Sequence, residues 1–311
     1  MNGAVAGSVK NQISLATWNV QTFFDGEKDG TEYDEFKKAS SWNREKYSVR
    51  VKRLCEAMKS IDADVFVFEE IENEGVLLDL TNQLVDWSYK DLWKYSCFAR
   101  LEGSGIGIGV LSRYELRDMT VHSVDLRGMK NEMPLMRPLV EVTVDVNGKD
   151  FILFANHWKS MTGSREETEI WRQWQEFLLG RRLMELKGAG RISAVICGDF
   201  NRDISAFIRD KDCASNVLLR CCADEQESIS VRSLWFNENG VLSSDVGSYY
   251  FQERWERIDN IFTFGDIEVL SFGPLARTPW ATDEKIPFSY KLSNGEGYSD
   301  HLPLLCKFRI K

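Results

Sequence analysis

The sequence predicts an α/β fold in which two β-sheets pack face to face and are covered by helices. Three observations support this fold class. Short apolar runs of strand length recur along the chain, two of them are joined by a hairpin turn, and helical segments lie between the runs. The 311 residues are enough for one large domain of this kind with an ample core.

The expected strands are apolar runs rich in β-branched and aromatic side chains. They cover residues 13–18, 64–68, 105–111, 139–146, 151–155, 194–197, 258–264 and 304–308. Residues 139–146 alternate apolar and polar side chains, and the Asn147-Gly148 dipeptide that follows is typical of a two-residue hairpin turn. The strands on either side of this turn are therefore expected to pair antiparallel.

Two segments have the spacing of amphipathic helices. In residues 44–60, one buried stripe is formed by Tyr47, Val51, Leu54, Cys55 and Met58. The cationic side of this segment is expected to be solvated and contains Arg44, Lys46, Arg50, Lys52 and Arg53. A capping box at 164–167 begins a longer helix, whose expected inward residues are Ile170, Trp174, Phe177 and Leu178.

The chain has no repeat, low-complexity tract or Pro/Gly/Ser-rich linker, which indicates one domain over residues 12–311. Residues 1–11 are expected to be a tail that is disordered or derived from cloning. The hydrophobic share of 43% and the charged share of 28% exclude a disordered protein. No apolar run approaches the roughly 18 residues of a membrane span. The net charge of -9 excludes a protein that coats nucleic acid by bulk positive charge.

Seven cysteines occur without a CxxC pair, so a structural zinc site is not expected. Cys55 and Cys197 lie inside apolar runs and are expected to be buried. A disulfide could form only within the cluster of Cys213, Cys221 and Cys222. Residues 1–10 lack the apolar core of a signal peptide. The protein is therefore cytoplasmic, or it is secreted or periplasmic with its signal missing from this sequence, and the second reading is slightly favoured.

Amides, carboxylates and imidazoles stand where the expected strands end or begin. They are Asn19, Glu69, Glu70, His157, Asp199, Asn201, Asp300 and His301. Because loops at strand ends carry chemistry on a rigid support, these side chains are candidates for one functional site. His122 lies in no such setting and is expected on the surface.

This set of side chains points to a divalent cation and a phosphate. With 3 histidines against 48 carboxylates, an oxygen-rich metal site is expected, and such oxygens suit Mg²⁺, Mn²⁺ or Ca²⁺. Two imidazoles beside the cation suit a reaction that builds negative charge, for which a phosphate is the leading substrate. No P-loop or GxGxxG fingerprint is present, and the glycine-rich residues 103–109 are expected to form a closely packed strand.

Six segments, in this order, resemble the motifs of the DNase-I-like endonuclease/exonuclease/phosphatase superfamily: TWNVQTFFD, DADVFVFEEIEN, NHWKS, GDFNR, RIDNIF and YSDHLPL. They extend from Thr17 to Leu304 and so cover nearly the whole chain. EEIEN and NHWKS are most similar to bacterial nuclease-type members. The resemblance implies a four-layer α/β sandwich, with two mixed, mostly antiparallel sheets inside and helices outside.

The same resemblance implies roles for the metal-binding candidates. Glu70 would be the principal metal carboxylate, assisted by Asn19 and Asp300. Glu69 stands where many relatives have Gln, so an exchange of roles between Glu69 and Glu70 stays open. Gln21 stands where some relatives carry an acid, and its amide weakens the case for a second metal. The expected cofactor is Mg²⁺, with Mn²⁺ or Ca²⁺ as alternatives.

Five residues would be catalytic by the same resemblance. Asp199, oriented by Asn201, would position or deprotonate the attacking water. His157 and His301 would donate hydrogen bonds to the charge that develops on the phosphate. Asp259 would hold the His301 ring and favour its protonated form. Asp199 and the Asp259–His301 pair are both open as the base.

The first functional hypothesis is a monomeric nuclease with nucleic acid, DNA or RNA, as its partner. Its candidate contacts to the substrate backbone are Arg137, Lys159, Arg165 and Arg202. The alternative is a phosphatase or phosphodiesterase of the sphingomyelinase-like or inositol-phosphatase-like kind, acting on a small or lipid-linked phosphate. Arg202 after GDFN counts against the inositol phosphatases, and the lack of an exposed apolar hairpin counts against a sphingomyelinase. A catalytically inactive protein that acts only as a binding module is disfavoured, because no motif residue is missing.

Overall fold

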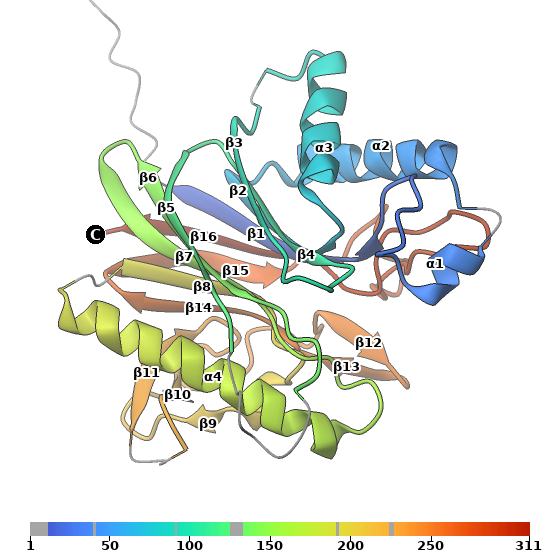
Figure 1. Cartoon of the computed structure of the whole chain (residues 1–311). Coiled ribbons are helices and arrows are strands. Elements are labelled where there is room, and N and C mark those ends of the chain that lie inside the picture. The colour runs from blue at the N-terminus through green and yellow to red at the C-terminus, as the bar shows by residue number, and fades with distance from the viewer. Residues whose placement is uncertain (1–11, 40–41, 91, 125–132, 191–192, 224–226) are drawn as a thin grey trace, which may run out of the picture.

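The computed structural model describes residues 12–39, 42–90, 92–124, 133–190, 193–223 and 227–311. Two sheets lie face to face in the middle of the molecule (Figure 1). The helices α2 (Arg44–Ile61) and α3 (Glu74–Asp86) cover one outer face, and α4 (Arg165–Gly188) covers the other. The predicted four-layer α/β sandwich is confirmed, whereas the predicted tail over residues 1–11 lies outside the described residues.

The six-stranded sheet joins the two ends of the chain. In spatial order its strands are β15 (Ile267–Pro274), β16 (Leu304–Ile310), β1 (Ile13–Phe23), β2 (Val65–Ile71), β4 (Gly107–Ser112) and β3 (Tyr95–Ala99). β1 pairs antiparallel with β16 and parallel with β2. Thr17 lies opposite Leu304 in this pairing. The residues that follow Thr17 and those that precede Leu304 therefore meet at one edge of the sandwich.

The eight-stranded sheet contains the predicted hairpin. Its strands are β5 (Glu115–His122), β6 (Leu139–Val146), β7 (Lys149–His157), β8 (Ser193–Asp199), β14 (Asp259–Gly265), β11 (Ser228–Ser233), β10 (Asn216–Arg220) and β9 (Ile208–Arg209). Asn147 and Gly148 have φ of 56° and 88° in the turn between the antiparallel strands β6 and β7, which confirms the hairpin. β8 is parallel to β7 because α4 carries the chain back between them.

Two apolar cores hold the layers together. One fills the space between the sheets and under α4, and it includes Leu15, Val67 and Leu183. The other lies between the six-stranded sheet and α2 and α3, and it includes Trp18 and Phe66. Alternate residues of β1 and β2 thus enter opposite cores, as the two-residue period of a strand requires.

Several elements were not predicted from the sequence. Edge strands such as β5 and β15 are largely exposed, so pairing with a neighbour defines them and their own side chains do not. The other unpredicted elements are β3, β9, β10, β11, the two-stranded hairpin of β12 (Tyr249–Phe251) and β13 (Arg254–Glu256), α1 (Asp34–Lys38), α3 and the short 3-10 helix Ile204–Ala206.

The start of α4 agrees with its capping box, but its buried face differs from the prediction. Ser164 accepts a hydrogen bond from the Glu167 amide. Ile170, expected inside, is 42% exposed, and the neighbouring Trp171 is buried instead. The helix approaches β10 closely at Gly180, where a Cβ would lie 2.4 Å from the Arg220 carbonyl oxygen, so Gly180 lies on the covered face.

The cysteine and histidine predictions have mixed outcomes. Cys55 and Cys197 are buried as predicted. The described residues contain no disulfide, so the bridge considered for the cluster at 213–222 does not form. His122 is half-buried and is not a simple surface residue, because its Nε2 lies 2.8 Å from the Glu141 carboxylate. No described helix is both long enough and apolar enough to cross a membrane.

Candidate active site

Three neighbouring strands of the eight-stranded sheet bring functional side chains into a row. His157 ends β7 and lies opposite Asp199, which ends β8. Asp259 begins β14 and lies opposite Asp199 on its other side. The approach of β8 to β7 requires glycine at position 198, where φ is +126° and a Cβ would lie 2.0 Å from the Asn156 carbonyl oxygen. The sheet edge therefore presents an imidazole and two carboxylates side by side.

The facing sheet contributes Glu70 through a break in strand alternation. Phe68 packs under α2 and α3, and a regular strand would turn Glu70 to the same side. Glu70 instead has φ of +66°, at a shift in the register between β2 and β4. This left-handed conformation turns the carboxylate toward the eight-stranded sheet, where its Oε1 lies 3.8 Å from His157 Nε2. The same oxygen accepts a hydrogen bond at 3.2 Å from Asn19 of β1.

Glu69 is enclosed behind the site. Its side chain is fully buried, its Oε1 accepts a hydrogen bond from the Thr17 hydroxyl at 2.7 Å, and its Oε2 has no hydrogen-bond partner within the described part of the chain. Burial, with the nearby Asp259 carboxylate, raises the pKa of Glu69 well above its ordinary value. An enclosed, protonated carboxyl cannot serve a cation in the open site, so the structure favours Glu70 over Glu69 for that role.

Asn19 connects the two sheets across the site. Its Nδ2 donates to Glu70 at 3.2 Å and to Asp199 at 3.1 Å, while its Oδ1 accepts a hydrogen bond from the Gln21 amide at 3.0 Å. The nitrogen thus faces the carboxylates, and in this orientation Asn19 positions Glu70 through a hydrogen bond. Asn201 adds two hydrogen bonds to Asp199, from its backbone N at 2.8 Å and from its Nδ2 at 3.1 Å.

The two histidines of the site have opposite charge states. Burial, reinforced by nearby cationic groups, lowers the pKa of His157 well below its ordinary value, so this ring is neutral. Burial also acts to lower the pKa of His301, but the Asp259 carboxylate outweighs it and raises that pKa well above the ordinary value. Asp259 Oδ2 lies 2.8 Å from His301 Nδ1. His301 is therefore a cation at neutral pH.

Asp199 is poised between its charged and neutral forms. Burial, followed by the Asp259 carboxylate, raises the pKa of Asp199 to about 7. One ligand-type atom from each of Asp199, Asp259 and His301 lies within 4.8 Å of the others, which is also the spacing of a metal site. Because His301 is protonated and bonded to Asp259, this trio is better described as an acid–base group.

A cavity of about 820 Å³ opens over these side chains. The residues named from the sequence that line it are Asn19, Glu70, Arg137, His157, Lys159, Arg165, Asp199, Asn201, Asp300 and His301. Asp259 does not reach the cavity and contacts His301 from behind. Tyr249 and Phe251 from β12 complete one wall, and the Tyr249 ring centroid lies 4.9 Å from that of His301. The fold thus gathers residues from both ends of the chain into one site.

Three of the four predicted substrate contacts face the cavity. Arg137, Lys159 and Arg165 line it. Burial lowers the pKa of Lys159, and Arg165 forms an ion pair with Glu256 at 3.3 Å. The cavity therefore combines carboxylates at its base with cations on its wall.

The prediction of Arg202 as a substrate contact is wrong. Its side chain is 5% exposed, and its guanidinium forms ion pairs of 2.5 Å with both Glu169 and Glu176 of α4. It also lies over the Trp158 ring, 5.1 Å from the ring centroid. Because both carboxylates come from α4, Arg202 joins the loop after β8 to this helix and is not available to a substrate.

Arg50 supports the site and was missed in the sequence, where it was assigned to a solvated side of its helix. It is 2% exposed and lies 3.7 Å from the Tyr290 ring centroid. Its guanidinium donates to the carbonyls of residues 20–22 in β1. A signal was present in the sequence, because Arg50 stands three residues after Tyr47 and four before Leu54, on the apolar stripe itself.

The donor chemistry of the cavity fits a divalent cation. Glu70 and Asp300 both line it, and neither carboxylate forms an ion pair with a lysine or arginine that the structure describes. Asp300 Oδ1 lies 4.0 Å from His301 Nε2, and hard carboxylate oxygens of this kind suit Mg²⁺, Mn²⁺ or Ca²⁺. Glu70 and Asp300 would hold the ion, with Asn19 orienting Glu70.

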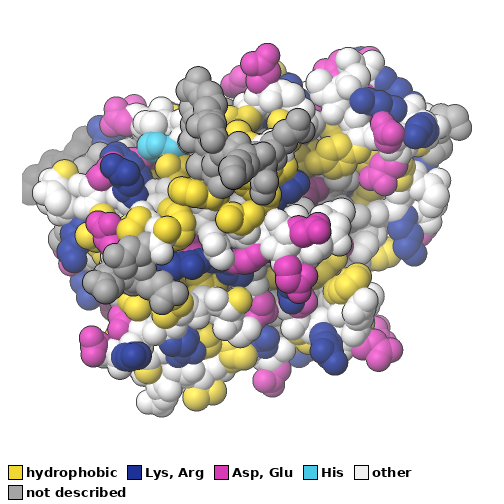
Figure 2. All heavy atoms as spheres, turned by 60° about the horizontal axis from the view of Figure 1, so that its bottom comes forward, with side chains coloured by type: hydrophobic (Ala, Val, Ile, Leu, Met, Phe, Trp, Pro, Cys, Tyr) yellow, Lys and Arg dark blue, Asp and Glu magenta, His cyan; other side chains and the backbone are white. Residues whose placement is uncertain are grey.

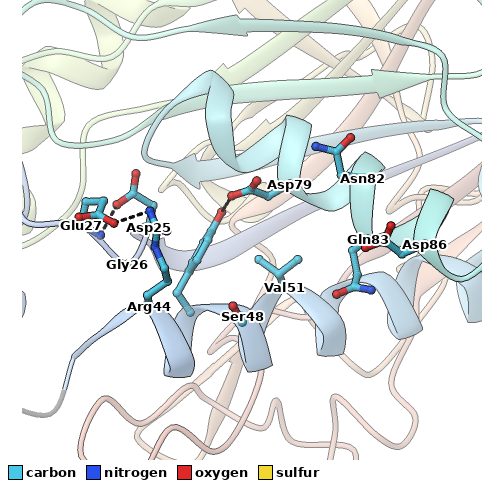
Figure 3. Close-up of a pocket in the computed structure, with 11 residues that line it drawn as sticks. Asp25, Gly26, Glu27, Arg44, Ser48, Val51, Asp79, Asn82, Gln83 and Asp86 are labelled. Atoms are coloured by element: carbon cyan, nitrogen blue, oxygen red, sulfur yellow. Dashed lines mark hydrogen bonds and ion pairs between the residues drawn. The ribbon is translucent and has the colours of Figure 1, made fainter.

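Another cavity, of about 360 Å³, lies between α2, α3 and the loop at Asp25 (Figure 3). Its polar side chains bond to one another: Arg44 pairs with Glu27 at 2.6 Å, and the Tyr47 hydroxyl donates to Asp79 at 2.7 Å. None of the site residues predicted from the sequence lines it. The larger cavity is therefore the candidate active site.

Known proteins resemble this chain in sequence pattern and in fold. The profile of the Endonuclease/Exonuclease/phosphatase family matches residues 14–268. The structure of ANGEL2, described as a 2′,3′-cyclic phosphatase, matches with a TM-score of 0.64 and 14% identity over 96% of this chain and 95% of that chain. An endonuclease/exonuclease/phosphatase from Bacteroides vulgatus matches with a TM-score of 0.55 and 19% identity, over 97% of this chain and 100% of that chain. TDP2 from D. rerio matches with a TM-score of 0.57 and 16% identity, over 96% of this chain and 100% of that chain. No curated protein matches the chain in sequence.

Proposed function

The chain belongs to the endonuclease/exonuclease/phosphatase family, and from this premise we propose that it is a Mg²⁺-dependent nuclease that hydrolyses phosphodiester bonds, with DNA as its leading substrate. Members of this family are phosphoric ester hydrolases that depend on a divalent metal. The observation that carries the proposal is the convergence of Glu70, His157, Asp199 and His301 in one cavity.

Asp199 is the proposed base for in-line attack of water. A pKa of about 7 suits a group that takes a proton at neutral pH. Asn201 and Asn19 hold its carboxylate with three hydrogen bonds, which limits its motion. The rival base, the Asp259–His301 pair, is disfavoured because His301 already carries a proton.

The two histidines are the proposed donors to the phosphate. His301, kept as a cation by Asp259, donates through Nε2, and His157 donates in its neutral form with the proton on Nε2. Hydrogen bonds to developing negative charge contribute roughly 2 to 4 kcal/mol each by analogy with oxyanion donors. Mg²⁺ held by Glu70 and Asp300 would polarise a phosphoryl oxygen and stabilise the leaving oxygen.

Nucleic acid as substrate is supported by the local cations of the cavity wall, Arg137, Lys159 and Arg165. Basic and acidic side chains are interspersed on the face in Figure 2, so binding would rest on these cations and the metal and not on a broad basic surface. The similar structure of TDP2 from D. rerio was solved with a single-strand DNA product. The alternative substrate is a small or lipid-linked phosphate, which a cavity of about 820 Å³ is large enough to enclose.

One assay separates these possibilities. The protein is incubated with plasmid DNA, single-stranded DNA, RNA, bis-p-nitrophenyl phosphate, and inositol and sphingolipid phosphates, each with Mg²⁺, Mn²⁺, Ca²⁺ or EDTA. We expect cleavage of DNA with Mg²⁺, none with EDTA, and a rate that falls as salt is added. Preferential turnover of a small monoester or a lipid would reject the nuclease in favour of the alternative. Absence of metal-dependent turnover on every substrate would reject an enzyme.

A further inference from the structure

A second cavity, of about 490 Å³, adjoins the candidate active site. It shares Arg165 and Glu256 with the larger cavity, so the two spaces meet at one wall. The charged residues that line it are Arg165, Arg209, Arg254, Arg257, Asp203 and Glu256. This space, called here the arginine groove, thus has twice as many arginines as acidic residues in a chain whose net charge is -9.

Arg165 pairs with Glu256, but the other three arginines of this groove form no ion pair with a carboxylate that the structure describes. Arg257 donates to the carbonyl oxygen of Ser244 at 2.9 Å, and Arg209 donates to that of Gly240 at 3.3 Å. Hydrogen bonds to neutral carbonyls hold a guanidinium in place without cancelling its charge. Arg254 is exposed, and its side chain forms no hydrogen bond or ion pair with any residue that the structure describes. The groove is therefore a fixed positive site with one free guanidinium.

The hairpin of β12 and β13 connects this groove to the candidate active site. Phe251 lies directly opposite Arg254 in the register of the two strands, so both side chains project from the same face of the hairpin. Phe251 lines the larger cavity and Arg254 lines the groove. A chain that leaves the candidate active site past Phe251 would therefore meet the Arg254 guanidinium next.

We propose that the arginine groove binds a phosphate of a nucleotide adjacent to the one cleaved, so that the preferred substrate is a single strand of several nucleotides and not an isolated phosphate ester. Guanidinium groups suit this role because their planar N–H donors match phosphate oxygens. A small ester fills the catalytic cavity alone and does not reach the groove. This inference rests on the proposed nuclease function, but it predicts a different observable, the dependence of binding on substrate length.

The test compares wild type with Arg254→Glu on two substrates, bis-p-nitrophenyl phosphate and a single-stranded DNA oligonucleotide, with Mg²⁺. We expect the variant to raise KM for the oligonucleotide about tenfold. The slope of the logarithm of the binding constant against the logarithm of the salt concentration should become about one less steep, which corresponds to one fewer ion released on binding. Its kcat and KM for the small diester should equal those of wild type. Arg181→Glu is the matched control, because Arg181 is an exposed arginine on α4 and its replacement changes the net charge equally.

Two outcomes would contradict the proposal that the arginine groove binds a phosphate of the substrate. One is an unchanged KM for the oligonucleotide in Arg254→Glu. The other is an equal rise of that KM in Arg181→Glu, which would indicate long-range charge instead of a site. Oligonucleotide binding measured by fluorescence anisotropy in EDTA does not depend on turnover. If wild type hydrolyses neither substrate, the proposed function fails, while weaker anisotropy binding by Arg254→Glu alone would still support the groove.

Discussion

The guanidinium of Arg50 donates a hydrogen bond of 2.9 Å to the carbonyl oxygen of Thr22. Thr22 has φ of 45°, and its own amide donates to Glu70 Oε2 at 2.5 Å. The same guanidinium donates to the carbonyl of Val20 at 2.9 Å. A buried cation thus holds a left-handed bulge of β1, and that bulge holds the carboxylate proposed to bind the metal.

Replacing Arg50 with Lys should therefore weaken metal binding. Lysine has a single ammonium and cannot span the carbonyls that the Arg50 fork contacts, so the Thr22 amide should shift relative to Glu70. We expect the affinity for Mn²⁺ to fall about 10- to 100-fold, the usual range when a residue behind a metal ligand is changed. The measurement is titration with Mn²⁺ followed by electron paramagnetic resonance, which does not require turnover.

Arg53→Lys is the matched control for this variant. Arg53 lies on the same helix and donates to the carbonyls of Gly295 and Gly297 at 2.8 Å, away from Glu70. We expect it to keep wild-type Mn²⁺ affinity. If Arg50→Lys folds and binds Mn²⁺ as wild type does, Arg50 does not position Glu70.

Asp199→Ala and His157→Ala should each reduce kcat by at least about 100-fold, because one removes the proposed base and the other a proposed donor to the phosphate. Both positions lie at strand ends, so circular dichroism should show a folded protein. His122→Ala is the control, since His122 pairs with Glu141 outside the cavity. Near-normal Mg²⁺-dependent hydrolysis in either site variant would disprove its assignment.

The unfolding free energies of Arg202→Met and Arg165→Met should differ, because Arg202 has a structural role and Arg165 is a proposed substrate contact. Removing the buried Arg202 breaks its ion pairs with Glu169 and Glu176, which keep Arg172 and Arg220 as partners, and we expect a loss of about 1 to 3 kcal/mol of unfolding free energy. Arg165 is exposed, and its replacement should change that free energy by no more than about 0.5 kcal/mol. Urea denaturation measures both. Similar unfolding free energies for the two variants would contradict this division.

Glu141 should make stability depend on pH under acidic conditions. Burial alone would raise the pKa of Glu141, but hydrogen bonds from His122 and Arg182 outweigh burial and lower that pKa to about 2. A carboxylate with a lowered pKa stabilises the fold above its ordinary pKa of about 4.5, and this stabilisation is lost as pH falls toward 2. Its size is on the order of 2 kcal/mol after allowance for solvent screening.

The variant Glu141→Gln tests this dependence. The difference in unfolding free energy between wild type and Glu141→Gln should be constant from neutral pH down to about 5 and should shrink below about pH 4.5. Urea denaturation at a series of pH values gives this difference. A difference that stays constant through pH 4 and below would show that the ion pair with Arg182 does not set the pKa of Glu141.

Local features of the sequence were enough to predict the framework of the fold. Asn147-Gly148 specified its hairpin because few other residues adopt two successive positive φ angles. Buried strands such as β7 and β8 appeared as apolar runs because both of their faces are covered. Exposed strands such as β5 did not appear, since their conformation comes from the strand beside them.

The residue types at the strand ends can be identified from the sequence, and they define the candidates for metal, acid–base and phosphate chemistry. The role of each candidate depends on its surroundings in the fold. Glu70 enters the cavity and Glu69 does not, because the left-handed backbone at Glu70 reverses strand alternation. Arg202 is enclosed by carboxylates of α4, and Arg50 is enclosed by β1. Burial and charge pairing depend on neighbours far away in the chain, so motif position alone could not assign these roles.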